Sequence, residues 1–253
     1  MTLRDNSTTR QTSMTANANV FLTAEWRDLL LLNYEVEPEF VRRSVPRGTE
    51  LDSFRGKTYV SLVGFRFLAT RLSGKLAIPF HTDFTEINLR FYVRREVQGE
   101  IRRGVVFIAE IVPRLAIATA ARVLYNENYV CRKMKHETSR ETKSLQYSWK
   151  EAERWCSLQA DFAGPPALPE EGSLQQFLIE HYWGYTSRKD AGSTEYRVEH
   201  VPWKIWPCMK VNFVGDPSNL YGHEFAKILR KPPDSVIIAE GSAVSVYNGT
   251  KIA

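Results

Sequence analysis

The residues best suited to chemistry lie on one face of a predicted strand, Phe84 to Arg95. Glu86, Asn88, Arg90 and Tyr92 alternate there with apolar side chains. Successive side chains of a strand point to opposite faces, so this strand has one polar and one apolar face. A carboxylate such as Glu86 can serve as a general acid or base, and a guanidinium such as Arg90 can bind a ligand carboxylate through paired hydrogen bonds.

Two arrangements fit this polar face. It can be the solvated outer face of an antiparallel sheet that has one wet side, which the pattern by itself favours. Alternatively, it lines the inside of a barrel, and the apolar face is covered by a second layer. The apolar residues of the strand are Ile87, Leu89, Phe91 and Val93.

The common catalytic and nucleotide-binding motifs are missing from the sequence. The histidines are scattered, and His81 to Asp83 with Glu86 reads as an ordinary junction between a loop and a strand rather than as a ligand set. Cys131 is followed by Arg132, but no base is placed beside it, so it reads as a packed strand residue. We therefore predict no metal site, no cofactor and no catalytic thiol.

Composition narrows the class of protein. The chain has 253 residues, of which 43% are hydrophobic, 12% aromatic and 25% charged. These values fit a globular domain rich in strands or with an aromatic-lined cavity.

Three widely spaced cysteines predict free thiols and a cytoplasmic protein. No apolar run is long enough to span a membrane. The net charge of +5 is mild and its basic residues occur in short pairs, which does not favour a nucleic-acid partner.

The predicted elements are mostly strands punctuated by glycine and proline. We expect a polar, disordered tail over residues 1–19 and a single domain over residues 20–253. Short helices are expected after Glu37, from Pro113 to Tyr125 and from Leu174 to Tyr182, where Ser173 is a candidate N-cap. A short apolar segment followed by a strand is expected over residues 21–36, and a hairpin with a polar tip at 189–192 is expected over 185–201. The remaining strands are expected at 58–68, 105–112, 129–136, 145–149, 155–162, 236–239 and 243–247.

The order and spacing of several segments resemble the YqjF-like family. The resemblance runs through most of the chain. Its segments are Trp26, Leu32 to Pro38, Val45-Pro46, Phe84 to Val93, Gly104 to Phe107, Ala121 to Tyr125, Phe177 to Tyr182 and His200 to Trp203.

That family is in turn similar to acetoacetate decarboxylase. The resemblance implies a mainly β fold, a closed or flattened antiparallel barrel with short helices packed outside and a buried cavity. The decarboxylase forms a Schiff base between a lysine and its keto-acid substrate. Its active-site glutamate resembles Glu86, its active-site arginine near the first strand resembles Arg27, and the arginine of its Gly-Arg-Glu helix ending resembles Arg122.

The lysine that carries the decarboxylase chemistry is not matched. This sequence has Tyr129 and Val130 where the decarboxylase pattern has two lysines. Lys133 and Lys135 follow, and they would share the face of Tyr129 if the strand continued regularly. The resemblance therefore argues against acetoacetate-type decarboxylation.

Together these observations predict a barrel whose cavity holds a small organic ligand, and we expect this ligand to be an acid paired with an arginine. The expected ligand-binding residues are Arg27, Asn88, Arg90 and Arg122. One alternative is a lyase or related enzyme that uses Glu86 as general acid or base, assisted by Tyr129 or Lys133. Another is a structural or interaction module whose inner face is simply packed. Whether the chain is an enzyme, and whether it forms a homo-oligomer, is left open.

Overall fold

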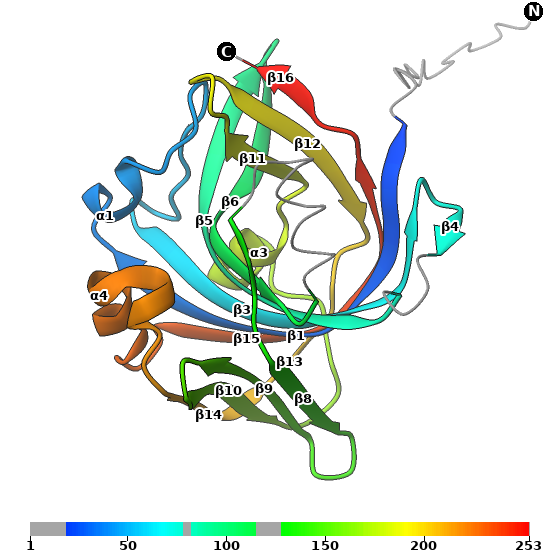
Figure 1. Ribbon diagram of the computed structural model, residues 1–253, viewed down its shortest axis with the longest axis vertical. Coiled ribbons are helices and arrows are strands. Elements are labelled where there is room, and N and C mark those ends of the chain that lie inside the picture. The colour runs from blue at the N-terminus through cyan, green and yellow to red at the C-terminus, as the bar shows by residue number, and fades with distance from the viewer. Residues whose placement is uncertain (1–18, 78–81, 115–127, 253) are drawn as a thin grey trace, which may run out of the picture.

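The structure is a computed structural model that describes residues 19–77, 82–114 and 128–252 (Figure 1). The expected tail apart from Asn19, most of the helix expected from Pro113 to Tyr125, and the candidates His81 and Arg122 lie outside these ranges. Among the described residues, no helix is long and apolar enough to cross a membrane.

The chain forms a 12-stranded sheet that curls round until β12 pairs with β15 and closes a barrel (Figure 1). Neighbouring strands of the ring are antiparallel except β6 and β11, which run parallel over two residue pairs. In order around the ring the strands are β15 (Ser235–Tyr247), β1 (Val20–Val36), β3 (Thr58–Leu72), β5 (Phe84–Val97), β6 (Glu100–Val112), β11 (Trp183–Ser187) and β12 (Ser193–His200).

Short strands extend this sheet at its margins, and a second sheet packs on it. The short strands are β2 (Glu50–Leu51), β4 (Leu76–Ala77), β7 (Tyr129–Cys131), β13 (Ile205–Trp206) and β16 (Thr250–Ile252). The second sheet has four strands, in the order β14 (Cys208–Val214), β10 (Arg154–Phe162), β9 (Ser144–Glu151) and β8 (Met134–Ser139).

The apolar side chains form two main clusters on opposite sides of the barrel wall. The outer cluster contains Ile87, Leu89, Phe91 and Val93 of β5 together with Tyr147 and other residues of the second sheet. The inner cluster, which we call the barrel interior, takes residues of β1, β3, β5, β6 and β15. The apolar face of β5 is therefore covered by a second layer, as the barrel arrangement requires.

The helices divide between the two sides. Helices α1 (Glu39–Arg42) and α4 (Ser218–Leu229) pack on the outer cluster. Helix α3 (Leu174–Ile179) instead buries Phe177, Leu178 and Ile179 in the barrel interior, and Figure 1 shows it within the ring of strands. The expectation that all helices pack outside is wrong for α3, because an apolar helix face is equally well buried on either side of the wall. Helix α4 was not predicted.

Several local predictions are confirmed. Ser173 caps α3, since its Oγ accepts the backbone N–H of Gln176 at 3.2 Å. The hairpin tip expected at Gln98 and Gly99 joins β5 to β6, and both residues have positive φ. The single strand expected over residues 129–136 is wrong, because β7 ends at Cys131 and β8 belongs to the second sheet.

Candidate functional site

The polar face of β5 lies inside the barrel. Glu86, Asn88 and Arg90 are only 2%, 2% and 9% exposed. Glu86 pairs with Phe65 of β3 across the ladder, and residues directly opposite each other share a face of the sheet. Since Phe65 belongs to the interior cluster, the Glu86 side chain points into the barrel as well. The solvated-face reading, which the sequence pattern by itself favours, is therefore wrong.

Glu86 is held by neighbouring polar side chains. Asn88 Nδ2 donates to Glu86 Oε1 at 3.0 Å, and the Tyr129 hydroxyl donates to Glu86 Oε2 at 3.2 Å. Tyr129 reaches this position because β7 pairs in parallel with β6 and sets it opposite Glu110, which itself pairs with Asn88. Glu110, 1% exposed, is thus a second buried acid that the sequence analysis did not propose. Its sequence signal was a lone acid in an apolar strand.

Arg90 turns away from Glu86 toward α3. Its Nη2 donates to the Leu178 carbonyl at 3.1 Å, and its guanidinium lies 5.6 Å from the centre of the Tyr92 ring. Within the described ranges, its Nε is buried without a hydrogen-bond partner, and no carboxylate is within ion-pair distance of it. Arg90 is therefore a buried cation without a protein counter-ion among those residues.

Three residues from separate segments gather beside α3. Asp52 Oδ2 lies 3.2 Å from Arg103 Nε and 4.0 Å from His181 Nε2. Burial raises the pKa of Asp52 despite the opposing effect of Arg103. Burial, reinforced by Arg90 and Arg103, lowers the pKa of His181 well below its usual value, so this imidazole is neutral at pH 7. Sequence reasoning missed all three, because no local spacing links them.

Aromatic rings fill the interior at the opposite end of β5 from Arg90. The Trp26 ring packs against Phe65, Phe67 and Trp203, with ring centres 5.5, 5.8 and 6.2 Å apart. Phe67 in turn stacks on Phe84 at 4.5 Å. Along β5, the interior therefore has an aromatic cluster at Phe84, then the Glu86 carboxylate, then the Arg90 guanidinium.

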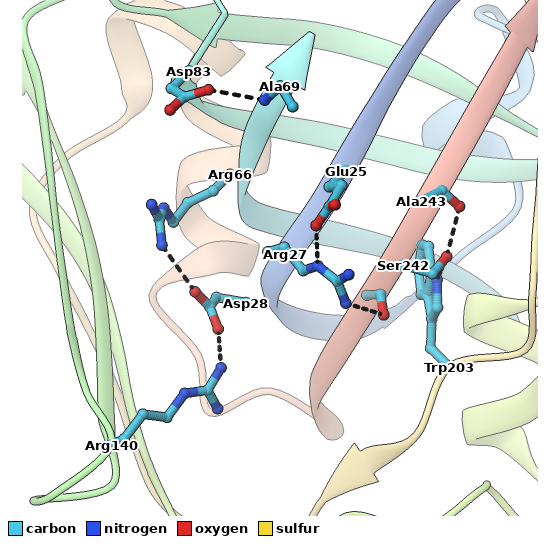
Figure 2. A network of polar contacts seen from close by, with 11 residues as sticks. Glu25, Arg27, Asp28, Arg66, Ala69, Asp83, Arg140, Trp203, Ser242 and Ala243 are labelled. Atoms are coloured by element: carbon cyan, nitrogen blue, oxygen red, sulfur yellow. Dashed lines mark hydrogen bonds and ion pairs between the residues drawn. The ribbon is translucent and has the colours of Figure 1, made fainter.

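Arg27 does not join this group. Its Nε donates to Glu25 Oε2 at 2.9 Å, as Figure 2 shows. Its Nη1 donates to the Gly241 carbonyl at 3.2 Å. The register of β1 shifts between Arg27 and Leu30, where Asp28 has a φ of 57°. This irregularity moves Trp26 to the interior position that regular alternation from Leu29 would give to Arg27. The ligand-binding role expected for Arg27 has no support from this placement.

The lysines also lie away from the interior. Lys133 is exposed in the loop between β7 and β8, and Lys135 is exposed with its Nζ 4.8 Å from the centre of the Trp155 ring. Every lysine of the chain falls within the described ranges, and none of them is buried. No lysine amine is therefore desolvated beside Glu86.

Cys131 is half-buried in β7 and is a free cysteine. Across the three described ranges, no group of three or more His, Cys, Asp or Glu side chains is arranged to hold a metal ion.

Solved structures show where this fold occurs. Acetoacetate decarboxylase from Legionella pneumophila superposes with a TM-score of 0.62 at 15% identity, covering 99% of this chain and 98% of that one. The enduracididine biosynthesis enzyme MppR, complexed with pyruvate, superposes with a TM-score of 0.63 at 12% identity, covering 96% and 93%. At these identities the likeness establishes the acetoacetate decarboxylase-like fold.

Sequence comparison identifies the family. The protein YqjF of Bacillus subtilis (strain 168) is 26% identical over 183 residues, which cover 71% of this chain and 73% of YqjF. The family model DUF2071, described as an uncharacterized conserved protein, matches residues 23–243. This match covers the second sheet and most of the barrel, and it leaves out β16, the start of β1 with Leu22 and the end of β15 with Val244. The chain therefore belongs to the DUF2071 family, and it has an acetoacetate decarboxylase-like fold.

Proposed function

We propose that the barrel interior binds a small organic acid whose carboxylate pairs with Arg90. The observation that carries this proposal is the buried Arg90 guanidinium with no carboxylate partner among the described residues. Burying an unpaired charge is costly, and buried charges are normally paired. A ligand carboxylate would supply the missing charge and accept the unused Nε–H.

The nearby acids are already engaged by other groups. Asp52 lies against Arg103, and Glu86 accepts hydrogen bonds from Asn88 and Tyr129. Because the His181 pKa is lowered, its ring is neutral at pH 7 and adds no positive charge that would compete with Arg90 for the anion. Arg90 therefore remains the cation available to an incoming carboxylate on the described interior face.

Asn88 adds a second requirement for the ligand. Because Asn88 Nδ2 donates to Glu86, its Oδ1 points away, and this acceptor is buried with no hydrogen-bond partner in the described part of the chain. Buried acceptors are normally satisfied by a donor. The proposed ligand thus bears a hydroxyl or amino group beside its carboxylate. A small organic acid is bound by this fold elsewhere, since MppR was solved with pyruvate.

The experiment is a thermal-shift titration with lactate, pyruvate and lactamide. Lactate has both the carboxylate and the donor, pyruvate lacks the donor, and lactamide lacks the charge. We expect lactate to raise the Tm most and lactamide least. A ligand at a hundred times its Kd stabilises the native state by about 2.7 kcal/mol.

Arg90→Gln should weaken lactate binding by about ten- to a hundredfold, the equivalent of a charged hydrogen bond worth roughly 1.5–3 kcal/mol. Without ligand, the variant should melt no lower than wild type, because an uncompensated buried charge has been removed. Arg94→Gln is the matched control, since Arg94 lies on the same strand but is half-exposed and paired with Glu50. Undiminished lactate binding by Arg90→Gln would refute the proposal.

A lyase is the second candidate, and the Tyr129–Glu86–Asn88 contacts favour it. Two donors hold the Glu86 carboxylate in one orientation beside the aromatic end of the interior. Such a group can take or return a proton at a carbon of a bound acid. Following the bound acids by NMR would detect this chemistry, and turnover lost in Glu86→Gln with binding retained would support it.

Imine chemistry is expected to fail. A Schiff base needs an unprotonated amine, and a depressed lysine pKa requires burial or a neighbouring cation. Since no lysine of this chain is buried, treatment with acetoacetate and borohydride should give no stoichiometric adduct by intact mass spectrometry. A mass gain that maps to Lys133 or Lys135 would contradict this prediction.

A further inference from the structure

A second candidate site lies on the outer side of the barrel wall, where the wall meets the second sheet. A hollow of about 350 Å³ is lined there by Arg66 of β3, Thr85 of β5 and Lys135 of β8, among others. Thr85 directly precedes Glu86 on β5, so its side chain points to the opposite face from the barrel interior. We call this hollow the junction pocket. It is separate from the Arg90 site and does not depend on the proposed function.

The junction pocket is rich in positive charge. Arg66, Arg114 and Lys135 line it, together with the imidazole of His136. The acid in its lining is Asp83, whose Oδ1 accepts the Ala69 N–H at 2.9 Å (Figure 2). The lining therefore includes three permanently charged cationic residues and one carboxylate, which is already hydrogen-bonded.

Arg66 is only partly neutralised by its own ion pair. Its Nη1 lies 3.3 Å from Asp28 Oδ2, while Arg140 Nη2 binds the other oxygen of the same carboxylate at 2.6 Å. Figure 2 shows Asp28 between the two guanidinium groups. One negative charge is thus shared by two arginines, and the rest of the Arg66 charge faces the pocket. For Arg114 and Lys135, the described residues provide no carboxylate within ion-pair distance.

The remaining lining is apolar or neutral. Leu68 and Met134 contribute hydrocarbon surface. His136 Nδ1 lies 3.4 Å from the Thr85 hydroxyl. Burial and the neighbouring Arg66 lower the pKa of His136, so the ring is largely neutral at pH 7 and offers a hydrogen bond without adding charge. A volume of this size lies within the range of small-molecule sites, which is roughly 300–1,000 Å³.

We propose that the junction pocket binds a small amphipathic anion. Its carboxylate or phosphate head contacts Arg66, Arg114 and Lys135, and its apolar body packs on Leu68 and Met134. Positive side chains without full counter-charges supply the attraction for the head group. The hydrocarbon surface beside them supplies the preference for an anion with an apolar body over a bare inorganic one.

The test compares matched probes by isothermal titration and by NMR of the Met134 methyl group. Phenyl phosphate and phenylacetate carry both features, inorganic phosphate lacks the ring, and benzyl alcohol lacks the charge. We expect one or both amphipathic anions to bind at least tenfold tighter than phosphate or benzyl alcohol and to shift the Met134 signal. Whichever anion binds more tightly identifies the head group. The affinity should fall as the salt concentration rises.

Variants then locate the binding. Lys135→Glu and Arg66→Gln should each lower the affinity for the tighter-binding probe at least fivefold. Lys135→Glu changes an exposed side chain and therefore keeps the fold. Lys133→Glu is the control, since Lys133 is exposed two residues away and does not line the pocket. Arg90→Gln should leave the affinity unchanged. Absence of binding at millimolar probe, equal losses in Lys133→Glu and Lys135→Glu, or a loss in Arg90→Gln would each overturn the proposal.

Discussion

Gly241→Ala is expected to destabilise the protein by about 2–5 kcal/mol, against about 1–2 kcal/mol for Gly56→Ala. Gly241 lies in β15 opposite Arg27 of β1 and has a φ of 75°. A Cβ atom there would clash with the Trp26 carbonyl oxygen and would stand 2.7 Å from the Trp26 carbonyl carbon. These are backbone atoms in the β1–β15 ladder, so they cannot move aside as a flexible side chain could.

Gly56 provides the matched control. Its φ of 80° carries the same left-handed strain, but nothing lies within 4 Å of the position that its Cβ would occupy. The difference between the two variants therefore isolates the steric conflict at Gly241. Urea denaturation followed by circular dichroism would measure both. Equal losses of stability would mean that β1 and β15 can separate at this point without cost.

Glu195→Ala is expected to cost about 3–5 kcal/mol, the usual effect of removing one partner from a buried ion pair. The Glu195 side chain is 4% exposed. Its oxygens lie 3.0 Å from Arg95 Nη1 and 2.7 Å from Arg102 Nη1, and it accepts the Tyr185 hydroxyl at 3.0 Å. These partners come from β5, β6 and β11, so the carboxylate ties β12 to the seam where β6 and β11 share only two parallel residue pairs.

The same substitution at Glu199 is the control for Glu195→Ala. Glu199 lies on β12 as well, but it is half-exposed and pairs with Arg197 and the Tyr247 hydroxyl at the surface. Surface pairs of this kind contribute about 0–1 kcal/mol. Thermal and urea unfolding should therefore separate the two variants by at least about 2 kcal/mol. Similar losses in both would show that the Glu195 cluster does not hold the barrel seam.

The periodic features of this protein could be read from its sequence. The alternation from Glu86 to Val93 predicted two faces of unlike character, because the strand period is fixed by backbone geometry. The Ser173 cap and the Gln98-Gly99 turn followed from local rules of the same kind. The substitution of Tyr129 for a lysine was also visible directly, and Tyr129 does meet Glu86.

Tertiary structure alone decided which face of β5 is buried and which distant residues share it. A polar face looks the same in sequence whether water or a barrel interior lies beside it, because its surroundings come from strands far along the chain. One irregular residue, Asp28, reversed the expected placement of Arg27, since a one-residue slip exchanges the two faces of a strand. The gathering of Asp52, Arg103 and His181 depends likewise on pairings and packing between separate segments, and no local rule encodes such contacts.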